Sequence, residues 1–153
     1  MKARTMFFSV VFCLVAMTVS FASNPNMGNW KLNEAKSKIP AGVAKNTTVV
    51  YEASGDSVKG TVDGVDAEGK PMHTEWTGKM DGKDYPLTGD PSADTRAYKM
   101  VDDRTTELTN KKAGKVTTTG KIVISPDGKS RTLTVTGTAK GKKFTYTATY
   151  DKQ

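Results

Sequence analysis

The chain has very few of the residues from which the commonest catalytic and metal sites are built. Its 153 residues include one cysteine and one histidine. Cys13 lies within the first 22 residues, so a chain cleaved after Ala22 has neither disulfide nor thiol chemistry. With His73 as the sole histidine, neither a catalytic triad nor a histidine metal cluster can be assembled in the usual way. We therefore expect no enzyme activity, no cofactor and no metal, and we expect His73 on the surface.

Basic residues are numerous but are nowhere clustered. The chain has 23 Lys and Arg against 16 Asp and Glu, a net charge of +7, and it contains no run of four or more Lys or Arg. A nucleic-acid interface is normally a clustered basic stripe. Dispersed lysines instead keep strands soluble and stop sheet edges from pairing with other chains. We expect no nucleic-acid partner.

The one long apolar stretch lies at the N-terminus. Two basic residues precede an apolar run that ends at about Ala16, and the small residues Ser20 and Ala22 occupy the −3 and −1 positions of a cleavage site. This pattern predicts a signal peptide over residues 1–22, whereas a membrane anchor would need roughly 18 strongly apolar residues. We expect a secreted protein, periplasmic or extracellular, with no stable membrane insertion after cleavage.

The segment 23–46 is the only other part without a strand-like pattern. Asn33 can accept an early backbone N–H and so cap a helix, and Pro40 and Gly42 would end it. The sequence therefore predicts a short helix near residues 33–38, ahead of a β domain over residues 47–153.

From Thr47 onward apolar and polar residues alternate. In "PMHTEWTGKM", Met72, Thr74 and Trp76 share one face and His73 and Glu75 the other. A period of two residues marks a strand with one buried and one solvated face. The many threonines agree with this, because a β-branched polar residue suits the wet face of a sheet.

Eight glycine-, aspartate- or proline-containing corners separate the alternating segments. They fall at Gly55-Asp56, Glu68-Gly69, Asp81-Gly82, Pro91-Ser92, Asp102-Asp103, Ala113-Gly114, Asp127-Gly128 and Lys140-Gly141. The connections are too short for parallel crossovers, so they predict an antiparallel up-and-down meander. Closing the meander buries its apolar face and removes its edges. We expect an all-β, lipocalin-like barrel of eight or nine strands, with a solenoid or a sandwich as the alternatives.

Two resemblances accompany this pattern. The segments "GNWKLNEAKSKIP" and "GTVDGVDAEGKPMHTEWTGKMDGKDYPLTGDP" and the closing "TYDKQ" resemble a family of uncharacterised secreted bacterial proteins that begin with W-K-L-N-x-x-K-S. That resemblance covers the whole mature chain and implies no particular activity. Gly28-Asn29-Trp30 is similar to the G-x-W of lipocalins and fatty-acid-binding proteins, barrels that hold small apolar ligands. It implies that Trp30 packs across a closed end of the barrel. The sequence has no clear T-D-Y motif, and we expect that Arg131, beside a turn, does not cover Trp30.

Acidic residues gather in "DGVDAEG" and "MDGKDYPLTGDPSAD". Oxygen-rich loops suit calcium, but the spacing matches no EF-hand loop, and Lys70 and Lys83 lie among the carboxylates. We interpret these residues as turn formers, with calcium binding as the alternative.

Aromatic and methionine residues recur on the faces that should point inward. We predict that seven of them contact a small apolar or amphipathic ligand inside a monomeric barrel: Tyr51, Met72, Trp76, Met80, Tyr98, Met100 and Tyr146. The alternative is an ordinary packed core in a structural or interaction module, because an eight-stranded barrel can either be filled by side chains or hold one small ligand. The third interpretation is an isomerase or hydrolase with a carboxylate-based active site inside the barrel.

Overall fold

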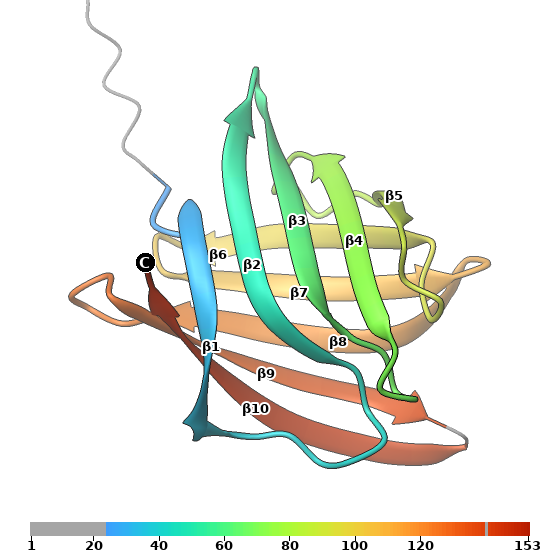
Figure 1. Cartoon of the computed structure of the whole chain (residues 1–153). Coiled ribbons are helices and arrows are strands. Elements are labelled where there is room, and N and C mark those ends of the chain that lie inside the picture. The colour runs from blue at the N-terminus through green and yellow to red at the C-terminus, as the bar shows by residue number, and fades with distance from the viewer. Residues whose placement is uncertain (1–23, 140) are drawn as a thin grey trace, which may run out of the picture.

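A computed structural model describes residues 24–139 and 141–153 (Figure 1). The predicted signal peptide lies outside the described residues. Ten strands follow one another along the chain: β1 (Gly28–Lys38), β2 (Lys45–Ser54), β3 (Ser57–Val65), β4 (Pro71–Gly78), β5 (Tyr85–Thr88), β6 (Thr95–Asp102), β7 (Thr105–Lys112), β8 (Lys115–Ile124), β9 (Ser130–Ala139) and β10 (Lys142–Lys152).

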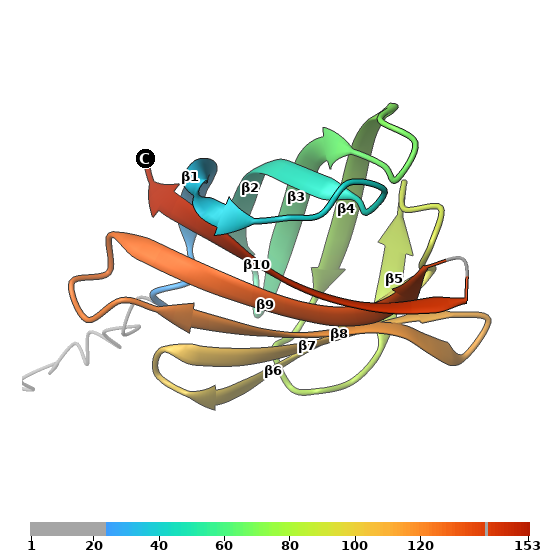
Figure 2. The ribbon, with the colours of Figure 1, turned by 90° about the horizontal axis from the view of Figure 1, so that it is seen from below.

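The strands form one closed antiparallel barrel in which each strand pairs with its neighbours in sequence and β1 pairs with β10. Figures 1 and 2 show β2, β3 and β4 side by side on one wall and β6 to β10 running across them on the other. The predicted all-β class and closed antiparallel meander are confirmed. The predicted count of eight or nine strands is wrong, since the described residues form ten.

The extra strand is β1, and it replaces the helix that was predicted for residues 33–38. The described residues contain no helix, and hence none with the length and apolarity to cross a membrane. Asn33 does make a local cap-like bond, because its Oδ1 accepts the backbone N–H of Lys36 at 3.1 Å. However, Trp30 and Leu32 pair with β10, and after a register shift Lys38 pairs with Thr147. Pairing with the last strand therefore outweighs the local helix signal.

The predicted corners lie at the turns that join successive strands from β2 to β10, with Lys140 of the last corner outside the described residues. The six turn glycines, at positions 55, 69, 82, 114, 128 and 141, all have positive φ, between 61° and 82°. In five turns the Oδ1 atom of an aspartate accepts the backbone N–H two residues later, at 2.8 to 3.1 Å: Asp66, Asp81, Asp90, Asp102 and Asp127. The acidic residues thus stabilise turns, as aspartate commonly does.

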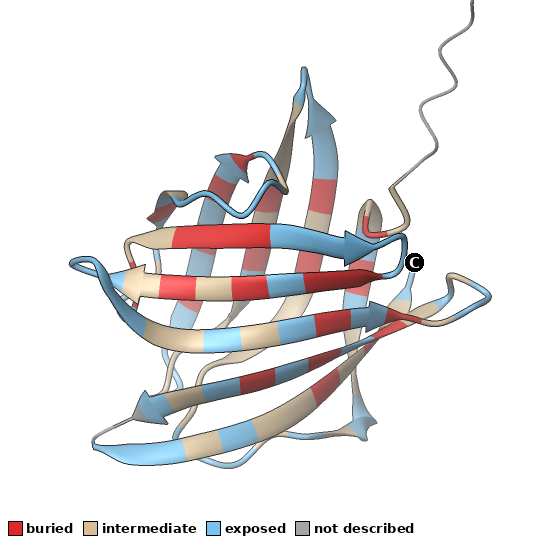
Figure 3. Cartoon of the chain, turned by 180° about the vertical axis from the view of Figure 1, so that it is seen from behind, coloured by how far each residue is buried: buried red, intermediate tan, exposed pale blue. Residues whose placement is uncertain are grey.

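Side chains sort into inner and outer faces as the alternation predicts (Figure 3). Along β4 every second residue is buried, so that Met72, Thr74 and Trp76 point inward while His73 and Glu75 are exposed. His73 lies outside the barrel, with its Nδ1 2.6 Å from Asp63 Oδ1. Burial of the apolar face against its partners across the barrel supplies the main stabilisation of the fold.

One end of the barrel is closed by Trp30, which is fully buried and donates its indole N–H to the carbonyl oxygen of Asn26 at 2.8 Å. The expectation that Arg131 does not cover this tryptophan is wrong. The guanidinium carbon of Arg131 lies 5.0 Å from the centre of the Trp30 ring. Although Arg131 follows a turn, it is the second residue of β9 and shares the inward face with Leu133 and Val135.

Candidate functional site

The opposite end of the barrel contains a cavity of about 340 Å³. Three connections border it, because residues 42–44 after β1, 66–68 after β3 and 90–92 after β5 line its mouth. Inward residues of β4 and of β6 to β10 form its wall. The volume lies near the lower end of the range of about 300 to 1,000 Å³ that is usual for small-molecule pockets.

Most of the cavity wall is apolar. It is formed by side chains from β4, β7, β9 and β10: Met72, Leu108, Leu133, Val135, Phe144 and Tyr146. Polar side chains interrupt this wall, among them Thr74, Arg96, Asn110 and Thr118. An apolar wall with a few converging polar groups is the usual composition of a site that holds and orients a small organic molecule.

Arg96 is the charged residue among these four. Its side chain is only 8% exposed, and its Nε donates to Oδ1 of Asn110 at 2.7 Å. Asn110 in turn donates from Nδ2 to the hydroxyl of Thr118 at 2.9 Å. The orientation of the Asn110 amide is therefore fixed from both sides, and this holds the guanidinium against the cavity wall.

Arg96 keeps its positive charge despite its burial. Burial alone would lower the pKa of this guanidinium, but the nearby oxygens of Tyr98, Tyr51 and Asp90 more than offset that effect, so the pKa is raised. Since arginine is already protonated at all physiological pH values, the cavity wall carries a permanent positive charge.

Three aromatic residues pack tightly beside the cavity. The hydroxyls of Tyr51 and Tyr98 are 2.7 Å apart, and the Tyr98 ring meets Trp76 edge to face at 4.9 Å between centres. The Trp76 indole donates to the carbonyl oxygen of Arg96 at 3.0 Å. Burial raises the pKa of Tyr98, so its hydroxyl stays protonated. This group forms a rigid support for the strand segment that carries Arg96.

The seven residues predicted to contact a ligand lie in three places. Met72 and Tyr146 line the cavity, whereas Tyr51, Trp76 and Tyr98 belong to the packed aromatic group beside it.

Met80 and Met100 lie apart from the cavity, and their sulfurs both accept from the amide of Asn24, at 3.3 and 3.7 Å. Met100 is 37% exposed. The structure thus brings two of the seven predicted residues to the cavity wall, and ligand contact by any of them stays a prediction.

Several polar residues of the wall were not among those predicted from the sequence, including Arg96, Asn110 and Thr118. A signal for Arg96 was present, since it stands two residues before Tyr98, and alternation places both on the same inward face. Asn110 stands two residues after Leu108 on β7, so alternation places both of these side chains on the inward face. These polar residues were not selected because the inward positions were assumed to be apolar.

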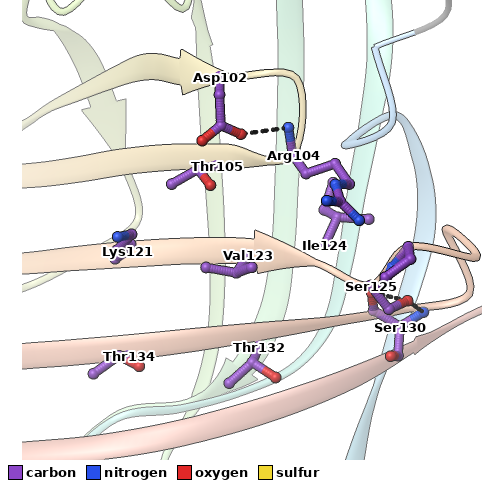
Figure 4. Close-up of a pocket in the computed structure, with 11 residues that line it drawn as sticks. Asp102, Arg104, Thr105, Lys121, Val123, Ile124, Ser125, Ser130, Thr132 and Thr134 are labelled. Carbon is purple, nitrogen blue, oxygen red and sulfur yellow. Dashed lines mark hydrogen bonds between the residues drawn. The ribbon is translucent and has the colours of Figure 1, made fainter.

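A second hollow, of about 610 Å³, lies on the outside of the barrel over the ends of β6 to β9. Figure 4 shows Lys121, Val123, Thr132 and Thr134 along its floor, with Asp102 and Arg104 at its edge. These six residues are all exposed. The described residues include no group of three or more His, Cys, Asp or Glu side chains placed to hold a metal ion. The cavity inside the barrel is therefore the better candidate site.

Comparisons with known proteins do not assign this chain to a family. No protein-family model matches the chain. No curated protein matches it either. The function must therefore be inferred from the cavity itself.

Proposed function

We propose that the protein is a secreted, monomeric binding protein that holds one small apolar or amphipathic molecule, non-covalently, in the cavity of its barrel. The observation that carries this proposal is the composition of the cavity wall, which is mostly apolar and includes the polar side chains of Thr74, Arg96, Asn110 and Thr118. A buried guanidinium beside a cavity is unusual in a core built only for stability, because burying a charge is costly even when it is hydrogen-bonded.

Affinity comes from removing the apolar part of the ligand from water. Each square ångström of apolar surface buried against residues such as Leu108, Leu133 and Phe144 contributes about 25 cal/mol. The polar side chains then set orientation, since a hydroxyl or an acidic group on the ligand meets Thr74, Arg96 or Thr118. The resemblance to lipocalin-like barrels agrees with this proposal.

The binding test uses N-phenylnaphthylamine, an uncharged apolar dye that becomes fluorescent when it leaves water. We expect saturable dye binding with one site per chain and displacement by decanol. Val135→Phe, on the cavity wall, should weaken dye binding at least tenfold because the added ring fills the cavity. Val123→Phe, on the exposed outer face, is the matched control and should leave binding unchanged. Weak, non-saturable binding to the folded protein would overturn the proposal.

Secretion is tested separately. We expect the protein recovered from the periplasm or the culture medium to begin at Ser23, as determined by N-terminal sequencing. A cell-associated protein that still carries residues 1–22 would contradict the predicted cleavage.

A second candidate function is an interaction module that works through its outer surface. The observation that favours it is a row of threonines across three strands, in which Thr119 pairs with Thr136 and Thr136 with Thr145. The hydroxyls of Thr136 and Thr145 lie 3.1 Å apart. Dye binding discriminates between the two functions, since only a cavity protein is sensitive to Val135→Phe and insensitive to Val123→Phe.

A further inference from the structure

We propose that the ligand is an anionic amphiphile, with one oxyanion head that pairs with Arg96 and an uncharged tail along the apolar wall, and that Asp90 is an internal counter-ion with which the head competes. This inference rests on the proposed function, because it names the chemical class of ligand for the same cavity.

The guanidinium of Arg96 has unused donors. Arginine offers five N–H groups. Two nitrogens of Arg96 donate to described residues. Nε donates to Asn110 Oδ1 at 2.7 Å, and Nη1 donates to the Tyr98 hydroxyl at the long distance of 3.5 Å. Nη2 makes no hydrogen bond to a described residue, and its nearest carboxylate oxygen, on Asp90, is 4.0 Å away. The outer edge of the guanidinium is therefore free to bind a ligand.

Asp90 neutralises Arg96 incompletely. Its Oδ1 is held by the turn between β5 and β6, where it accepts from the backbone N–H and the hydroxyl of Ser92 at 2.8 and 2.7 Å. The other oxygen stays beyond hydrogen-bond distance of Arg96, although both side chains are nearly buried. A buried cation is costly unless it is paired closely. An oxyanion at hydrogen-bond distance would supply the pairing that Asp90 does not.

The geometry favours a planar or tetrahedral oxyanion at the free edge. Because Asn110 occupies Nε and the bond from Nη1 to the Tyr98 hydroxyl is long, the two Nη groups remain as a fork, and such a fork binds two oxygens of a carboxylate or a sulfate in parallel. Asn110 acts as a positioning residue, since its own amide is fixed by Thr118. Carboxylate and sulfate head groups can both form this pair of hydrogen bonds.

The rest of the cavity restricts the ligand to a single negative charge. Asp66, Glu68 and Asp90 border the mouth, and like charges brought together disfavour binding. The wall beyond Arg96 is formed by apolar residues such as Leu133, Val135 and Phe144. A molecule with one acidic head and an uncharged tail satisfies both conditions.

The test compares two competitors of equal chain length, decanoate and decanol, for their ability to displace N-phenylnaphthylamine at pH 7. A hydrogen bond between charged groups is stronger than one between neutral groups, and a tenfold change in affinity corresponds to about 1.4 kcal/mol. We therefore expect decanoate to bind at least tenfold more tightly than decanol. Decyl sulfate, measured in parallel, distinguishes a carboxylate from a sulfate head.

Three variants test which charged residue is responsible for the preference for decanoate over decanol. Arg96→Gln should abolish the preference for decanoate over decanol. Asp90→Asn, which removes the competing carboxylate and keeps its shape, should increase the ratio of decanoate to decanol affinity several-fold. Lys121→Gln removes a positive charge from the outer face and should change neither affinity, so it controls for net charge.

The failure of the anion proposal can be distinguished from the failure of the cavity function. Equal binding of decanoate and decanol by the wild-type protein would overturn the anion proposal and leave the cavity function intact. Failure of the dye itself to saturate would overturn both. If Arg96→Gln does not fold, as judged by circular dichroism, Asp90→Asn decides the matter, because an unchanged ratio of decanoate to decanol affinity would contradict the role of Arg96.

Discussion

The guanidinium of Arg131 stacks on Trp30, with its central carbon 5.0 Å from the ring centre. The same group lies 5.3 Å from the ring of Tyr51 and 4.9 Å from that of Tyr150, and it is 2% exposed. Two of its nitrogens, Nε and Nη1, have no hydrogen-bond partner among residues 24–139 and 141–153. Arg131 therefore stabilises the closed end through contact with aromatic faces rather than through ion pairing.

A pair of substitutions separates packing from charge at Arg131. Arg131→Ala should lower the free energy of unfolding by about 3 kcal/mol, because it opens a cavity among three aromatic rings. Arg131→Met keeps the stem and removes the unpaired N–H groups, so the loss should be about 1 kcal/mol. Urea denaturation measures both. An equal loss in the two variants would show that the cation–π contacts, and not packing, dominate.

Two turn glycines with nearly the same φ should respond differently to alanine. Gly69 and Gly89 have φ of 81° and 80°. A Cβ at Gly69 meets nothing within 4 Å, whereas a Cβ at Gly89 overlaps the carbonyl oxygen of His73. Gly69→Ala should cost about 1 to 2 kcal/mol, from backbone strain alone. Gly89→Ala should cost about 3 kcal/mol or more, because the backbone must also shift. Thermal denaturation with similar losses for both would contradict the close contact between β4 and the connection after β5.

The buried tyrosines predict a loss of stability in alkali. Burial raises the pKa of Tyr98 and of Tyr150 above the ordinary value of about 10. Above that pH the unfolded chain releases phenolic protons that the folded chain retains, so the free energy of unfolding falls as pH rises. This stabilising contribution is complete below pH 10 and is lost progressively above it.

Urea denaturation at a series of pH values, with phenolate absorbance followed in parallel, checks this prediction. Tyr98→Phe should reduce the steepness of the decline above pH 10, because one of the groups whose pKa is raised by burial is gone. A stability that stays constant from pH 9 to well above 10 would contradict the buried position of these hydroxyls.

Much of the barrel was predictable because β-strand alternation is a local property. The inward and outward faces of β4 follow directly from "PMHTEWTG", and aspartate and glycine identify the turns. β1 was not predictable in this way. Its second half bulges away from regular pairing between Asn33 and Lys38, so no regular alternation is visible there, and only contact with the distant β10 makes it a strand.

The candidate site was predicted less well than the fold. The sequence indicated the two wall residues Met72 and Tyr146, because apolar inward positions are easily recognised. Arg96 was missed although alternation places it on the inward face, because its burial depends on Asn110 and Asp90 from other parts of the chain. A charged residue at an inward position is stable only when its partners arrive with the fold, and a single sequence does not show those partners.

Mapping of backbone amide chemical shifts during a titration with decanoate tests the central claim most directly. The account predicts saturable changes at the cavity wall, at Arg96, Asn110 and Val135 above all, and none at Val123 or Thr132 on the outer face. Changes confined to the outer face, or no changes at concentrations that saturate the dye competition, would contradict a ligand site inside the barrel.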